Sequence, residues 1–166
     1  MFNKILAACA SLVLAAAPAT AKVDGGTVDL INYIDGSDIV LSIDGPHCDS
    51  GDYLGVYMHR GMKRKLVLCP GGDVDALDHA VVRHEVLHAV QHCVNVARQT
   101  PLNTPVEQDT EELMKHANAV LNPKVIKFVQ DNYTKDKWLL EIEANLAMEL
   151  FTAAEIKAMF IQACMG

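Results

Sequence analysis

The chain has few aromatic residues, no extended basic run and no apolar run of membrane-spanning length. Aromatic residues make up 5% of its 166 residues, and Trp occurs once. Its 14 Lys and Arg stand against 21 Asp and Glu, a formal net charge of −7. Nucleic acids and anionic membranes attract clustered positive charge, so we expect neither as a partner. The apolar stretch at residues 5–17 is shorter than the roughly 20 residues of a membrane-spanning helix, so we expect no stable membrane insertion.

Apolar residues are plentiful, and the length suits one folding unit. Hydrophobic residues make up 51% of the chain and charged residues 21%. This composition provides enough apolar surface for a packed core and does not resemble that of disordered chains. A chain of this length fits one domain better than two. We therefore expect a single domain over residues 22–166.

The first 21 residues have the pattern of a secretory signal peptide. Lys4 gives a cationic start, residues 5–17 are apolar, and Ala19 and Ala21 supply the small residues that precede a cleavage site. We predict cleavage after Ala21 and a secreted or periplasmic protein. Residues 6–9 also resemble a lipoprotein box ending at Cys9, but almost no apolar segment separates this box from Lys4. Plain secretion is therefore the preferred interpretation.

Four cysteines remain after the signal segment, in a compartment that permits disulfides. Four cysteines allow three pairings, which the sequence alone does not distinguish. We favour Cys48 with Cys69 and Cys93 with Cys164, because each pair would join the ends of neighbouring elements. The alternatives are four buried free thiols, or a metal site that uses His47 and Cys48. The absence of a C-x-x-C spacing argues against a metal site.

The order of the elements predicts an α+β fold, with a small N-terminal sheet over residues 22–72 and helices after it. Four short extended runs, separated by turn residues, are expected as strands at residues 28–34, 38–43, 53–58 and 63–68. Within 73–98 we expect a helix capped by Asp75. Its apolar residues lie on nearly every face, so we expect it to pack between two layers. The helical part, residues 104–166, shows start signals at Thr104, Asn122 and Thr152 and a further helix at about 136–151.

The motif that indicates chemistry is His84-Glu85-Val86-Leu87-His88, an HExxH sequence inside the helix expected over 73–98. Four residues of helix rise about 6 Å and return to the same face, so both imidazoles can reach one metal ion. Zn²⁺ is the expected ion. Glu85 lies beside the metal in this arrangement, where its carboxylate can act as general base toward a metal-bound water. The alternative is a core helix that merely carries two packed histidines.

A catalytic zinc site usually needs a third protein ligand. His92 continues the four-residue series, but it lies about 12 Å along the helix from His84 and cannot close the same site. We expect His92 to support the site from outside the coordination sphere or simply to pack. Position 94, where a third His of another common spacing would stand, is Val. The third ligand must therefore come from elsewhere in the chain.

The second motif is Glu141-Ile142-Glu143-Ala144-Asn145, within the helix expected at 136–151. An HExxH helix followed by an E-x-x-A-N helix resembles the gluzincin type of zincin metallopeptidases, including the IrrE-like group. The resemblance implies a zincin-like fold and Glu141 as the third zinc ligand. It also places Asn145 where it can orient a ligand histidine. Glu143 is the reserve candidate for the third ligand, and the alternative for either Glu is a solvated helix charge.

Other polar residues are weaker candidates. His116 and Tyr133 could donate to a developing oxyanion, although a surface histidine and a packed tyrosine explain them as well. Asp73, Asp75 and Asp78 could suggest calcium, but capping and the helix dipole account for three acids at a helix start.

These observations predict a secreted zinc metallopeptidase that acts on a peptide or protein substrate, with His84, His88 and Glu141 as ligands and Glu85 as general base. Two alternatives remain open. One is an exported zinc-binding or interaction protein whose zincin-like core is catalytically inactive. The other is a purely structural protein in which the histidines are packed and the disulfides hold the fold.

Overall fold

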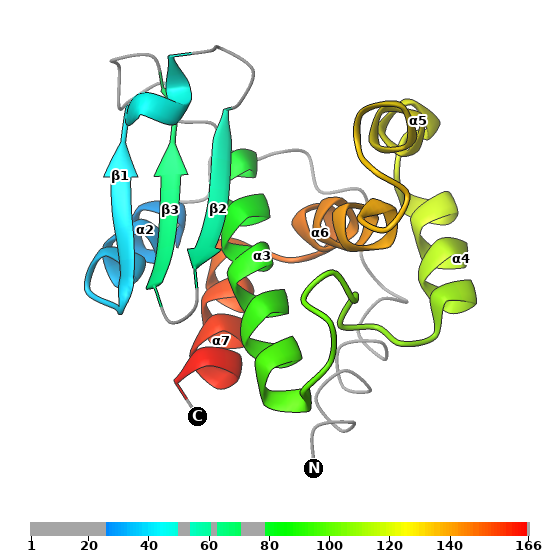
Figure 1. The fold of residues 1–166 in the computed structure, drawn as a ribbon. Coiled ribbons are helices and arrows are strands. Elements are labelled where there is room, and N and C mark those ends of the chain that lie inside the picture. Colours follow the sequence, from blue (N-terminus) through cyan, green and yellow to red (C-terminus); the bar gives the residue numbers. More distant parts are fainter. Residues whose placement is uncertain (1–25, 50–53, 61–62, 71–78, 166) are drawn as a thin grey trace.

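A computed structural model describes residues 26–49, 54–60, 63–70 and 79–165. Within these ranges the chain forms an α+β fold, as predicted, with one small sheet followed by a helical part (Figure 1). The predicted signal peptide and Asp73, Asp75 and Asp78 lie outside the described residues. Within the described part, no helix combines the length and apolarity needed to cross a membrane.

The sheet has three strands, β1 (Ile39–Ile43), β2 (Gly55–Arg60) and β3 (Lys63–Leu68), in the order β1-β3-β2. β3 lies in the middle and pairs with β1 in parallel and with β2 antiparallel. Three of the four predicted strands are therefore confirmed. β2 is an edge strand, and the edge that it leaves unpaired within this sheet faces the long helix α3 (His79–Arg98) (Figure 1).

The first predicted strand, residues 28–34, is wrong, because this segment belongs to helix α2 (Gly26–Asp35). Its buried residues Thr27, Leu30 and Ile34 follow the three- and four-residue spacing of a helix, while Val28 is 56% exposed. A short apolar run fits a strand and a buried helix equally well until its neighbours are known. Here, packing against α3, α7 (Ala153–Cys164) and β1 selects the helix.

α3 is the central helix of the fold. It contacts β2 and β3 on one side and α6 (Trp138–Leu150) and α7 on the other. Buried residues occur on nearly every face of its second half, which confirms the predicted position between two layers. The helix ends at Arg98, and the next residue, Gln99, has a positive φ of 58°.

The helix start predicted with Thr104 as N-cap is wrong: α4 (Thr110–Val120) begins five residues later, with Asp109 as N-cap, whose side chain accepts from the first-turn amides. In a helix capped by Thr104, the amides of Val106 and Glu107 would lie in the first turn. Here they donate instead to the carboxylate of Glu143. The predicted starts at Asn122 and Thr152 are confirmed. Asn122 caps α5 (Pro123–Asn132), and Thr152 forms a reciprocal capping box at α7.

Two hydrophobic clusters meet at α6. The larger cluster joins α2, the sheet, α3 and α7, and includes Ala144 of α6. The smaller one is formed by α4, α5 and α6, and includes Ile142 and Leu146. α6 therefore contributes to both clusters, and its position is set from two sides.

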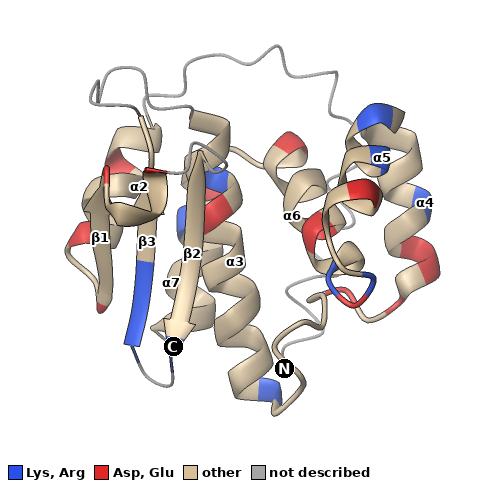
Figure 2. Cartoon of the chain, turned by 45° about the horizontal axis from the view of Figure 1, so that its top comes forward, with Lys and Arg blue, Asp and Glu red and all other residues tan. Residues whose placement is uncertain are grey.

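Two disulfides link neighbouring elements. Cys48 pairs with Cys69, and Cys93 of α3 pairs with Cys164 of α7, which confirms the favoured pairing. Cys48 is thus engaged in a disulfide and does not form a metal site with His47. Figure 2 shows a basic first half of β3, where Arg64 pairs with Asp38 and also donates to Sγ of Cys93. The two disulfides fit an extracellular protein.

Gly55 allows β2 to approach α3 closely, and we expect Gly55→Ala to be destabilising. A Cβ at this position would lie 2.7 Å from Cγ1 of Val81 and 2.9 Å from Cγ of Glu85. Overpacking of this kind costs about 1–3 kcal/mol of unfolding free energy, measurable by denaturant titration. Gly36→Ala is the matched control, because its Cβ would meet its nearest atom at 3.6 Å. Equal stability of the two variants would contradict the close-approach argument.

Candidate metal centre

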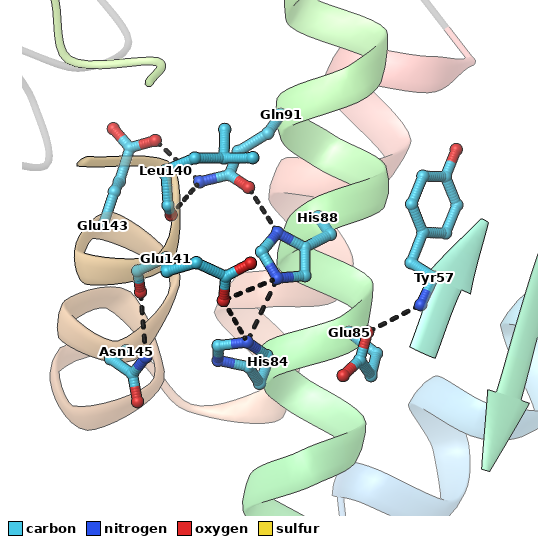
Figure 3. Close-up of polar contacts among 9 residues, drawn as sticks. All are labelled: Tyr57, His84, Glu85, His88, Gln91, Leu140, Glu141, Glu143 and Asn145. Carbon is cyan, nitrogen blue, oxygen red and sulfur yellow. Dashed lines mark hydrogen bonds and ion pairs between the residues drawn. The ribbon is translucent and has the colours of Figure 1, made fainter. Parts of the chain in front are cut away.

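His84 and His88 lie in the middle of α3 and direct their rings to the same side, toward α6 (Figure 3). Their Nε2 atoms are 3.1 Å apart, and the two rings stand at 90° to each other. The spacing of one helical turn brings the rings together, as the sequence predicted. Each side chain is about one-seventh exposed, at 15% and 14%.

Glu141 reaches the two histidines from the first turn of α6. Its Oε2 lies 3.3 Å from Nε2 of His84 and 3.4 Å from Nε2 of His88. The side chain is 9% exposed, and Oε2 makes no well-formed hydrogen bond. Two nitrogen atoms and one carboxylate oxygen thus converge, and His84, His88 and Glu141 form a group that could hold a metal ion.

The three side chains are coupled electrostatically. Burial raises the pKa of Glu141, but the two neighbouring imidazoles outweigh burial and hold this pKa at about 2. Burial lowers the pKa of His88, but Glu141 and Glu85 outweigh it, so the pKa of His88 is raised above its usual value. The carboxylate of Glu141 is therefore ionised at neutral pH, and its negative charge attracts a proton or a metal cation to the group.

Glu85 lies beside the group and not within it. Its carboxylate is directed toward β2, where Oε2 accepts a hydrogen bond of 2.7 Å from the backbone N–H of Tyr57 (Figure 3). The residue is buried, and burial raises the pKa of its carboxyl, although His88, His84 and the Tyr57 amide oppose the shift. Glu85 is therefore a stronger base than a solvated glutamate.

Gln91, which sequence reasoning missed, orients His88. Its Oε1 lies 2.7 Å from Nδ1 of His88, and its Nε2 donates to the carbonyl oxygen of Leu140 at 3.0 Å and to Oε2 of Glu143 at 2.9 Å. Asn145, predicted for this role, instead donates to the carbonyl oxygen of Glu141. The available signal was helical spacing, since Gln91 stands three residues after His88.

Glu143, the reserve ligand, is not part of the three-residue group. Both of its carboxylate oxygens face away from the histidine pair and accept from other donors. Val106 N donates to Oε2 and Glu107 N donates to Oε1, each at 2.7 Å. Of the two acids in the E-x-x-A-N motif, Glu141 is thus the one that meets the histidines.

A cavity of about 250 Å³ opens beside the group, between β2, α3 and the start of α6. It reaches His88 and Glu141 and is otherwise lined by a mixed set: Tyr57, His59, Gln91, His92, Leu102, Asn103, Lys137 and Leu140. A second cavity of similar volume lies among α3, α4, α6 and α7. Gln91 and Glu143 line it too, but its walls are mainly apolar. A ligand in the first cavity would touch two members of the group directly.

The remaining predicted candidates lie elsewhere. His92 packs, as one of the two predictions for it stated: its ring centroid is 4.2 Å from that of His59 and 5.9 Å from that of Tyr57. His116 pairs with Glu112 on α4 at 3.1 Å. Tyr133 caps the end of α5 and is 37% exposed. Neither His116 nor Tyr133 lines the cavity beside the group.

Comparison with protein-family models, with curated proteins and with solved structures found no match to this chain. The function of this chain is therefore inferred from its residues and their geometry.

We expect His92 to make the fold sensitive to acid. Burial, with His59 and Arg64 nearby, lowers the pKa of His92 to about 4. An unfolded chain binds this proton near pH 6.5, so the unfolding free energy attributable to His92 is complete above pH 6.5 and falls as the pH drops toward 4. The slope is at most about 1.4 kcal/mol per pH unit.

His92→Phe keeps the ring packing and removes the titration, so its unfolding free energy should depend less on pH over this range. Denaturant titrations at several pH values measure the difference. His116→Gln, at a partly exposed histidine of α4, is the control for the loss of a histidine. Identical slopes for His92→Phe and the wild type would show that His92 is not held neutral by the fold.

Proposed function

We propose that the chain is a secreted zinc-dependent metallopeptidase, in which His84, His88 and Glu141 bind Zn²⁺ and Glu85 acts as general base. The observation that carries the proposal is the convergence of three ligand atoms at 3.1, 3.3 and 3.4 Å from one another. Bonds of about 2.0–2.1 Å in a tetrahedral zinc site separate ligand atoms by about 3.3–3.4 Å. The two distances to Glu141 match this separation, and the distance between the two nitrogens is about 0.2 Å shorter.

The donor set favours zinc over harder ions. Two imidazole nitrogens and one carboxylate oxygen are ligands that zinc accepts in catalytic sites, whereas calcium and magnesium prefer oxygen alone. Oε2 of Glu141 is buried without a well-formed hydrogen bond, and such an oxygen is costly unless a cation or proton compensates it. The orphaned oxygen therefore supports a bound cation.

Zinc in this position would polarise a substrate carbonyl and lower the pKa of a coordinated water. The chain's own residues supply the rest. The cavity beside His88 and Glu141 gives a peptide bond room to approach. Glu85 follows His84 in the motif and is buried, and its raised pKa would suit it to take a proton from water and return it to the leaving amine. For this role its carboxylate has to turn from the Tyr57 amide toward the cavity, which it does not line here.

Secretion is part of the proposal. It is supported by the signal-peptide pattern of residues 1–21, with cleavage after Ala21, and by the two disulfides, which form in oxidising compartments. A metallopeptidase exported in this way would meet peptide or protein substrates outside the cytoplasm.

One observation favours a second candidate, an exported zinc-binding or interaction protein without turnover. Oε2 of Glu85 is already engaged by the Tyr57 amide of β2, so the carboxylate is held on the strand side of α3. If this hydrogen bond persists when zinc and peptide are present, the proton acceptor is missing. The two candidates share the zinc site and differ in catalysis alone.

Zinc binding should depend on Glu141. We expect the purified protein to retain one equivalent of zinc and Glu141→Gln to weaken zinc binding by more than about 100-fold, above the 10–100-fold typical for an outer partner of a ligand. Equilibrium dialysis with elemental analysis measures both. Glu149→Gln, on the exposed face of the same helix, is the matched control. Absence of stoichiometric zinc in the wild type would favour the structural reading with packed histidines.

Catalysis should depend on Glu85, whereas zinc binding should not. Glu85→Gln is expected to keep one equivalent of zinc and to lower kcat for peptide hydrolysis by about 10²–10⁴-fold, the usual contribution of a general base. A peptide library with mass-spectrometric readout provides the substrate. Glu111→Gln, at the exposed start of α4, is the control. Zinc-loaded wild type that cleaves no peptide would support the second candidate, and wild-type rates in Glu85→Gln would refute the base.

A further inference from the structure

A continuous chain of hydrogen bonds runs from His88 to the loop that follows α3, here called the linker loop (residues 99–109). His88 Nδ1 contacts Gln91 Oε1, Gln91 Nε2 donates to Glu143, and Glu143 accepts from Val106 and Glu107 of the linker loop. Figure 3 shows the part of this chain between His88 and Glu143. None of these residues except His88 belongs to the proposed ligand set.

The contacts of Gln91 fix the orientation of its amide. One end of the amide faces the Leu140 carbonyl oxygen, which only accepts hydrogen bonds, and Oε2 of Glu143, which also accepts from the Val106 amide. The NH₂ group must therefore occupy that end, because a flipped amide would place three oxygens together. The opposite end, directed at His88, is consequently the amide oxygen.

The orientation of the amide determines the tautomer of His88. An amide oxygen accepts and does not donate, so Nδ1 of His88 must carry the hydrogen of this 2.7 Å contact. In neutral His88, Nε2 then carries the lone pair, and Nε2 is the atom that faces His84 and Glu141. A metal requires that lone pair.

Glu143 is held in place by donors from two elements. Oε1 accepts from Glu107 N, and Oε2 accepts from Val106 N and from Gln91. The linker loop is anchored further by Asn95, which donates to the carbonyl oxygen of Thr104 at 2.7 Å, and by Arg98, which donates to that of Val106 at 2.7 Å. Glu143 thus joins α6 to a loop that is itself attached to α3.

We propose that Gln91 and Glu143 are positioning residues that preset His88 as the Nδ1–H tautomer, and that the linker loop belongs to this device because its amides hold Glu143. The inference rests on the proposed zinc site and deepens it. The contact between Glu143 and the linker loop raises zinc affinity by some factor. By thermodynamic linkage, bound zinc raises the equilibrium constant for forming that contact by the same factor.

Gln91→Leu removes the acceptor for His88 Nδ1 and preserves the side-chain size. Its zinc affinity, measured by competition with a chromogenic chelator, should fall 10–100-fold, the range for loss of an outer partner of a ligand. Gln162→Leu, an exposed glutamine on α7, is the matched control and should bind zinc as the wild type does. Thermal unfolding of the zinc-free variants checks that both are folded.

A double variant supplies a readout that general destabilisation does not reproduce. Gln91→Glu alone sets a carboxylate against Glu143, and Glu143→Gln alone sets an NH₂ group against a backbone N–H, so each should bind zinc more weakly. Combined, residue 91 again accepts from His88 while residue 143 donates to it. The Leu140 carbonyl oxygen and the Val106 amide keep unfavourable partners in the double variant, but the contact between residues 91 and 143 is restored. The double variant should therefore lose less zinc affinity than the sum of the two single losses. Additive losses would overturn the proposed link between Gln91 and Glu143.

The zinc-free protein tests the tautomer separately from the metal. Because Glu141 and Glu85 raise the pKa of His88, ¹⁵N NMR of histidine is followed to a pH at which this ring is neutral. There, His88 should show protonated Nδ1 and unprotonated Nε2 in the wild type, and a shift toward the other tautomer in Gln91→Leu. Wild-type protein that binds no zinc but shows this pattern would refute the proposed function and retain the positioning role. An unchanged tautomer in Gln91→Leu, or zinc affinity within twofold of the wild type, would refute the positioning role itself.

Discussion

Three electron-rich atoms held against one another are the constraint on which the site depends. Two imidazole nitrogens and a carboxylate oxygen lie within 3.4 Å of each other, largely shielded from water. Such an arrangement is unfavourable unless positive charge lies among them. A proton on one imidazole satisfies some of the contacts, whereas a divalent cation satisfies all three simultaneously. The fold therefore has to supply enough packing energy to keep the atoms together.

That packing comes from the two helices that carry the ligands. α3 is enclosed by the sheet on one side and by α6 and α7 on the other, so its histidines have little freedom to turn away. α6 contributes to both hydrophobic clusters, through Ala144 in one and through Ile142 and Leu146 in the other. The Cys93–Cys164 bridge ties α7 to α3 five residues beyond His88. The ligand atoms thus converge because the backbones beneath them are fixed.

Local patterns predicted the features that depend on local geometry. Helical spacing alone brings His84 and His88 to one face, and the capping signals at Asn122 and Thr152 act within a single turn. The pairing of the cysteines followed from the predicted neighbourhood of the elements. Glu141 came from resemblance to a known motif, since sequence spacing does not bring a residue of one helix against another.

The errors arose where tertiary contacts override local preference. Residues 28–34 suit a strand by composition, yet their burial against α3 and α7 requires a helix. Thr104 does not start a helix because Glu143, 37 residues after Val106, captures the Val106 amide. Gln91 was missed although it stands three residues after His88, because its spacing does not show that Leu140 and Glu143 of α6 orient its amide. No local pattern records which acceptor a side chain will meet across a helix pair.

The shared position of α6 has a further consequence for how the molecule can vary. α4 and α5 pack mainly on α6 and contribute none of the three converging atoms. Substitutions on α4, which lines the apolar cavity with Glu112, Leu113 and His116, can therefore reshape that cavity without changing the three converging atoms. In evolutionary terms, the cavity-facing side of α4 can diversify around a centre that α3 and α6 keep constant.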